Sequence, residues 1–220
     1  MNRQAVNPYL PSWEYIPDGE PHVFNGRVYV YGSHDRFNAP IFCVNDYVCW
    51  SAPVEDLSEW RYEGVIYRKK QDPKNPLGYH LLFASEVCLG PEVRYYLYYA
   101  FDFLGIMSVA VCDTPAGEYK FLGHIHYADG TLWGRRRGDQ LPFDPGVLAD
   151  DDGRVWLYSG FYNAVPAILT GGHKLRCDGG TVLELEKDMV TIKTEPRVIF
   201  PKKGPGAFQG HEFFEERSIR

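Results

Sequence analysis

The sequence lacks any uninterrupted apolar stretch of the roughly 18 residues that a membrane-spanning helix requires, which argues against a membrane partner. Its first residues, Met-Asn-Arg-Gln-Ala-Val-Asn-Pro, also lack the apolar segment of a secretory signal, so we expect a cytoplasmic protein. The five cysteines form no C-x-x-C pair and no even-numbered framework. They are therefore expected to be reduced, buried thiols rather than disulfides or metal ligands.

Long runs of one charge are absent as well. The formal net charge is −6, and the single basic cluster, Arg135-Arg136-Arg137, is flanked by glycines. An acidic chain repels phosphate unless a basic face compensates for it. Nucleic acid is therefore excluded as an expected partner, and the cluster is interpreted as a solvated loop.

Apolar spacing of three and four residues does not persist for three turns anywhere, so very little helix is predicted. In its place the chain has 15% aromatic residues, including 16 tyrosines and 13 phenylalanines, which favour strands. Its 22 glycines and 16 prolines supply many turns. The composition predicts an all-β fold.

A short strand pattern repeats along the chain. Residues 27–31 read RVYVY, and residues 94–98, 67 positions later, read RYYLY. Residues 154–158, a further 60 positions on, read RVWLY. The turn dipeptides Asn25-Gly26 and Asp152-Gly153 precede two of the three, as expected for hairpins. We interpret the three segments as the innermost strands of successive units.

Other strands of each unit are predicted at residues 106–111, 119–125, 181–186 and 189–193. Repeated four-stranded units can form either a sandwich or the radial blades of a propeller. A period of about sixty residues is long for a sandwich hairpin and suits a blade with extended loops. The propeller is therefore the favoured architecture.

An acidic residue precedes each repeated strand at a similar distance. Asp18, Glu86 and Asp144 lie nine, eight and ten residues before the strands. Equivalent positions of successive blades converge at one end of a propeller channel, where close carboxylates raise each other's proton affinity. Glycoside hydrolysis needs one protonated and one ionised carboxyl group, so it accounts for this arrangement. The alternative is that these residues only cap turns.

Three segments resemble glycoside hydrolase family 43. Residues 15–35, which include YIPDGEPHVFNGRVYVYGSHD, are similar to its first blade, and residues 143–158 to its third. Residues 213–220, FFEERSIR, are similar to the opening of its fourth blade. The resemblance implies one five-bladed β-propeller catalytic domain over residues 1–220, truncated at its C-terminal side to about three blades plus the start of a fourth.

The resemblance also implies roles for individual residues. Asp18 matches the general base that activates water, and Glu215 matches the general acid. Asp144 matches the aspartate that tunes the pKa of the acid and helps to orient it. The implied activity is the removal of xylose or arabinofuranose from plant-derived oligosaccharides with inversion, as in xylan degradation by β-xylosidases and α-L-arabinofuranosidases.

Further expectations concern the surroundings of these acids. Trp133, in a polar glycine-rich loop, is a candidate sugar-stacking residue. His34 and Asp35, at the end of the first inner strand, are candidate ligands of a sugar hydroxyl. No cofactor or metal is expected, although calcium is found in the complete family fold.

Truncation would expose sheet edges, favouring self-association or a missing C-terminal portion, and would leave this chain alone poorly active. The alternative to an enzyme is a non-catalytic carbohydrate-binding propeller or an inactive fragment.

Overall fold

The computed structural model describes residues 7–160 and 165–204, and nearly all of their regular structure is β-strand. The strands are β1 (Glu20–Phe24), β2 (Arg27–Tyr31), β3 (Tyr47–Pro53), β4 (Arg61–Tyr67), β5 (Leu82–Leu89), β6 (Tyr95–Phe101), β7 (Met107–Cys112), β8 (Lys120–His124), β9 (Gly146–Ala149), β10 (Val155–Ser159), β11 (Gly179–Leu185) and β12 (Arg197–Pro201). One short 3-10 helix, η1 (Lys69–Gln71), precedes β5. Within these ranges no helix has the length and apolar character needed to cross a bilayer.

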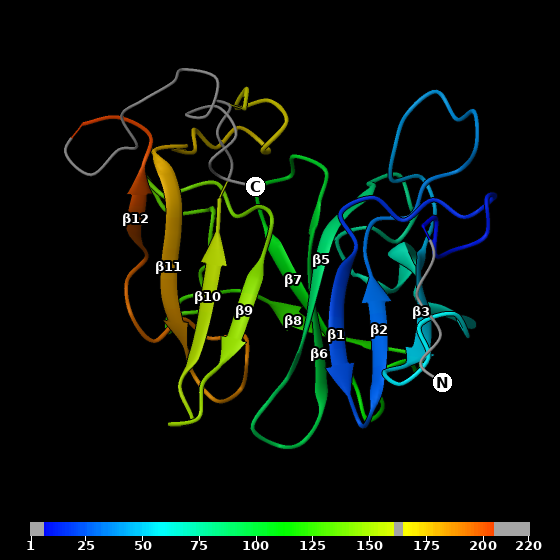
Figure 1. Cartoon of the computed structure of the whole chain (residues 1–220). Coiled ribbons are helices and arrows are strands. Elements are labelled where there is room, and N and C mark those ends of the chain that lie inside the picture. The colour runs from blue at the N-terminus through cyan, green and yellow to red at the C-terminus, as the bar shows by residue number, and fades with distance from the viewer. Residues whose placement is uncertain (1–6, 161–164, 205–220) are drawn as a thin grey trace.

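The strands form three four-stranded antiparallel sheets, each built from four consecutive strands (Figure 1). We call β1–β4 the first sheet, β5–β8 the second and β9–β12 the third. Their innermost strands lie together, because β5 packs against both β1 and β9. The all-β class is therefore confirmed, and the three sheets are arranged as the blades of a propeller.

Most of the core consists of two apolar layers on either side of the second sheet, and a smaller cluster contains Ala100, Leu141 and Phe143. Along β6, Leu97 and Tyr99 face the first sheet, whereas Tyr96 and Tyr98 face the third. Successive side chains of a strand point to opposite faces, so a strand buried on both faces carries apolar residues at every position. All seven residues of β6 are buried for this reason.

The hairpin between β1 and β2 forms as the sequence predicts. Asn25 and Gly26 connect the two strands with φ angles of 49° and 75°. A two-residue turn with both residues in the left-handed region matches the twist of the flanking strands, and asparagine and glycine tolerate that region best. This tight turn fixes the register that pairs Glu20 with Tyr31.

Two strand assignments from the sequence are wrong. The repeated segments form β2, β6 and β10, which are the second strands of their sheets rather than the innermost. Each innermost strand instead precedes its repeat in the chain. The outermost strand of the third sheet is β12, not residues 189–193, which make only isolated bridges.

Candidate functional site

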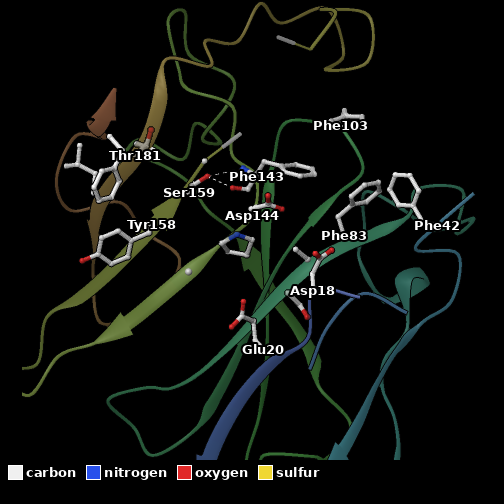
Figure 2. Close-up of a pocket in the computed structure, with 18 residues that line it drawn as sticks. Asp18, Glu20, Phe42, Phe83, Phe103, Phe143, Asp144, Tyr158, Ser159 and Thr181 are labelled. Atoms are coloured by element: carbon white, nitrogen blue, oxygen red, sulfur yellow. Dashed lines mark hydrogen bonds between the residues drawn. The ribbon is translucent and has the colours of Figure 1, made fainter. Parts of the chain in front are cut away.

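A cavity of about 630 Å³ opens at the end of the array where the innermost strands begin (Figure 2). Its walls come from all three sheets. The first sheet contributes Asp18 and Glu20, the second contributes residues 83–85, and the third contributes the start of β9 and the end of β10. Side chains far apart in the sequence therefore meet in one hollow, among them two of the three acidic residues singled out by spacing, Asp18 and Asp144.

Asp18 and Asp144 occupy the same place in two different sheets. Each lies two residues before the innermost strand of its sheet and lines the cavity. Their φ angles are 54° and 47°, in the left-handed region that aspartate tolerates better than most residues with a side chain. The matching conformation delivers both carboxylates into one cavity from neighbouring blades.

The turn at Asp144 is fixed by Ser159 at the end of β10. The Ser159 hydroxyl accepts a hydrogen bond from the Phe143 N–H at 2.9 Å and donates one to the Phe143 carbonyl at 2.7 Å. The N–H of Gly160 also donates to this carbonyl, at 3.0 Å. Because the serine is buried, these bonds hold the backbone immediately before Asp144.

The turn at Asp18 is fixed by close packing rather than by a hydroxyl. Gly32 follows β2 at the position that Ser159 has in the third sheet. A Cβ atom on Gly32 would lie 2.8 Å from Ile16 Cγ2 and 2.9 Å from the Pro17 carbonyl oxygen. Only glycine lets the segment before Asp18 approach the strand this closely.

The second sheet departs from this pattern, and the expected equivalence of Glu86 with the two aspartates is wrong. Glu86 pairs with Tyr98, as Glu20 pairs with Tyr31. The residue two positions earlier, at the place of the aspartates, is Ala84. Counting from the repeated strands failed because the connection between β5 and β6 is longer than the Asn25-Gly26 turn, so similar spacings reach different levels of the innermost strand.

A wall of phenylalanines, which the sequence analysis did not identify, lines the cavity beside Asp144. The rings of Phe103 and Phe143 stack with centroids 5.4 Å apart and planes 15° apart. Phe83 packs against Phe143 at 5.6 Å, and Phe42 meets Phe83 edge-on at 5.4 Å. Exposed ring faces are the surfaces against which the C–H face of a sugar packs.

A buried thiol lies close to these aspartates. Burial raises the pKa of the Cys43 thiol to about 11, and the charges of Asp35, Asp18 and Asp144 act in the same direction. A thiol with such a pKa stays protonated near neutral pH and is a poor nucleophile. This thiol is therefore not a candidate nucleophile.

His34 and Asp35 do not line the cavity formed by the described residues. The His34 ring nitrogens contact the Asp46 carbonyl oxygen and Glu14 Oε1, both at 2.9 Å. Asp35 Oδ1 accepts a hydrogen bond from the Cys43 N–H at 2.5 Å. Both side chains fix the loop that follows β2, which gives no support to the predicted contact with a sugar hydroxyl.

The expectation that Trp133 is an exposed platform is wrong. Its side chain is fully buried in the core between the second and third sheets, beside Tyr127, Val155 and Leu183. A tryptophan without exposed surface has no ring face to offer a sugar. The loop that contains it is polar, but the tertiary packing of the two sheets encloses this one side chain.

Two further expectations concern residues or groups beyond what the structure describes. The proposed acid, Glu215, lies outside the described residues. Among residues 7–160 and 165–204, no three His, Cys, Asp or Glu side chains converge in a way that would hold a metal ion.

Blade-like sheets around a cavity with paired aspartates define a propeller with an acidic central site. A family model, that of glycosyl hydrolases family 43, matches residues 17–216. The chain is 58% identical over its full length to a xylosidase/arabinosidase of Thermoclostridium stercorarium. It is 28% identical to a xylosidase/arabinosidase of Bacteroides ovatus, over 87% of this chain. The chain therefore belongs to glycosyl hydrolase family 43.

Solved structures share the fold of this chain. A β-xylosidase/α-arabinofuranosidase from a compost metagenome superposes with a TM-score of 0.62 at 24% identity, covering 90% of this chain and 62% of that one. An α-L-arabinofuranosidase from Clostridium thermocellum gives 0.55 at 25% identity, covering 81% and 55%. The chain spans 45% and 61% of the lengths of the two curated relatives named above.

Proposed function

We propose that this chain forms part of a glycoside hydrolase that removes terminal xylose or arabinofuranose from plant-derived oligosaccharides with inversion. The observation that carries the proposal is the delivery of Asp18 and Asp144 into one cavity from matching left-handed turns. Membership of the family and the names of the relatives support the substrate class.

In the proposed mechanism, Asp18 acts as the general base. It takes a proton from a water molecule, whose oxygen attacks the anomeric carbon of the sugar. The glycosidic C–O bond breaks as that bond forms, and the leaving oxygen receives a proton from the general acid. Inversion requires the base and the acid to stand about 6.5–9.5 Å apart, so that water fits between the base and the sugar.

Asp144 and Glu215 complete the proposed set. Glu215 is our candidate for the acid on the basis of its sequence motif. An ionised Asp144 nearby would favour the protonated form of that acid, because like charges repel. The phenylalanine wall would pack against the apolar face of the sugar and exclude water from the reacting centre.

The test is substitution within the cavity. In the full-length context, purified Asp18→Asn and Asp144→Asn variants should each lose about 10²- to 10⁴-fold in the hydrolysis of nitrophenyl β-xyloside and α-L-arabinofuranoside. Asp151→Asn, on the exposed turn between β9 and β10, is the matched control and should hydrolyse both at the unaltered rate. Proton NMR of the first-formed anomer reports inversion.

The unaltered chain is assayed beside these variants, with calorimetric binding of xylobiose. Near-normal hydrolysis by Asp18→Asn would overturn the assignment of the base. Binding of xylobiose without any product would instead favour a non-catalytic carbohydrate-binding protein.

A further inference from the structure

Glu20 is a third carboxylate in the cavity, and the proposed mechanism does not use it. It is the first residue of β1, two positions after Asp18, and its side chain lines the same hollow as Asp18 and Asp144 (Figure 2). In the part of the chain that the structure describes, its carboxylate forms no hydrogen bond or ion pair with the protein.

The same position carries different groups in the three sheets. The register of the innermost strands places Glu20, Glu86 and Gly146 opposite Tyr31, Tyr98 and Tyr158 of the strands next to them. These are therefore equivalent positions, one in each blade. Whatever Glu20 does can be compared directly with its two counterparts.

Glu86 is already engaged by the fold. Its side chain is nearly buried, and its Oε1 lies 3.2 Å from His22 Nε2 on β1. Glu86 thus links the first sheet to the second and does not line the cavity.

Gly146 lines the cavity but has no side chain, and a Cβ atom there would find nothing closer than Tyr158 Cβ at 3.8 Å. The third sheet thus leaves open space at this level. Of the three equivalent positions, Glu20 is the one that presents a polar side chain to the cavity.

Glu20 is exposed, so a molecule that enters the cavity can reach its carboxylate. Desolvation raises its pKa, the charges of Glu86 and Asp18 raise it further, and His22 opposes them. An ionised carboxylate accepts strong hydrogen bonds. A hydroxyl group is the donor that a carbohydrate would bring.

We propose that Glu20 is a substrate-binding residue whose carboxylate accepts a hydrogen bond from a hydroxyl of the sugar that reacts at Asp18. The proposal rests on the proposed function, because it places a sugar beside Asp18. A site built to bond a hydroxyl discriminates strongly against analogues that lack it. Glu20 would thus select sugars with a hydroxyl at that one position.

The experiment measures binding rather than turnover. Saturation-transfer NMR titrations with xylose, arabinose and the basic iminosugar deoxynojirimycin compare the unaltered chain with Glu20→Ala and Glu20→Gln. Glu92→Gln, in the exposed turn at the opposite end of β5, is the control. Thermal unfolding of each variant verifies that it folds.

We expect Glu20→Ala to raise the dissociation constant of the sugar that binds by roughly 10- to 100-fold, which is the effect of losing a charge-assisted hydrogen bond. Glu20→Gln keeps an acceptor oxygen but loses the charge. It should therefore weaken the cationic iminosugar more than the neutral sugars, and Glu92→Gln should change neither.

The two proposals fail in different ways. If the unaltered chain binds a sugar and Glu20→Ala binds it with the same dissociation constant, the role of Glu20 alone is overturned. The absence of binding by the unaltered chain, for all three probes, would overturn that role and the proposed function together.

Discussion

The first and third sheets differ from the second at the same point of their structure. Where Asp18 and Asp144 enter the cavity, the second sheet places Ala84. Gly32 in the first sheet and Ser159 in the third fix these turns. The equivalent residue of the second sheet is Tyr99, whose hydroxyl donates a hydrogen bond to Asp72, and neither residue lines the cavity.

The contrast shows that the turns before the innermost strands differ in role between the sheets, whereas the repeated strands do not. The repeated strands are nearly interchangeable, because each must pack a pleated apolar surface against its neighbours. The turn before each innermost strand is free of that requirement and can carry chemistry. The second sheet, covered on both faces, uses its polar groups for packing. Three substitutions at the equivalent positions test this division.

Gly32→Ala should have the largest effect. The added Cβ would lie 2.8 Å from Ile16 Cγ2 and 2.9 Å from the Pro17 carbonyl, so the turn before Asp18 must shift. We expect hydrolysis to fall by about 100-fold, as a displacement of the order of 1 Å in a catalytic group produces. The free energy of unfolding should fall by about 1–3 kcal/mol.

Steady-state rates and urea unfolding check this prediction. Gly123→Ala is the control, because its Cβ would meet Val190 Cγ1 at 3.4 Å, an ordinary contact. Full activity in Gly32→Ala would mean that close packing at Gly32 does not position Asp18.

Ser159→Ala should have a smaller effect on the third sheet. It removes both hydroxyl bonds to the Phe143 backbone but leaves the bond from Gly160 N–H. We expect kcat to fall by about tenfold with little change in KM, because the turn at Asp144 loosens while the walls of the cavity remain.

Ser159→Thr, which keeps the hydroxyl, should restore most of this activity. Ser58→Ala, on the exposed turn between β3 and β4, is the control. Equal losses in the alanine and threonine variants would show that the volume at this position matters rather than its hydrogen bonds.

Much of the scaffold could be predicted from the sequence because its signals are local. The strand repeats and the Asn25-Gly26 turn follow from alternation and turn chemistry, which depend on neighbouring residues alone. The convergence of Asp18 and Asp144 followed from applying the repeat to a radial architecture. Each of these inferences needs only residues that are close in sequence, together with the assumption that the sheets repeat around one axis.

The errors concern long-range contacts. The pairing of β5 with β6 places Glu86 level with Glu20 rather than with Asp18, and residue spacing alone cannot show this pairing. Trp133 is buried by sheets that are distant in sequence. The sequence did contain one signal for the true outer strand, β12, namely the pair Gly179-Gly180. These glycines allow Phe200 of β12 to approach closely, since its carbonyl oxygen would lie 2.0 Å from a Cβ on Gly179.

Tyr99→Phe should have the smallest effect on activity, although it lies at the position equivalent to Gly32 and Ser159. Its hydroxyl donates to Asp72 Oδ2 at 2.7 Å and contacts the Tyr67 hydroxyl at 2.6 Å. Because Asp72 is fully buried, loss of this donor should cost about 1–3 kcal/mol of unfolding free energy. Tyr96→Phe, on the same strand, is the control in urea unfolding.

Hydrolysis by folded Tyr99→Phe should stay within about twofold of the unaltered rate. Tyr99 does not line the cavity, so the loss of its hydroxyl should lower stability without moving the reacting groups. A loss of activity comparable to that of Ser159→Ala would contradict the division of labour between the sheets. Unchanged activity with reduced stability would mean that one structural position serves catalysis in two blades and the buried Asp72 in the third.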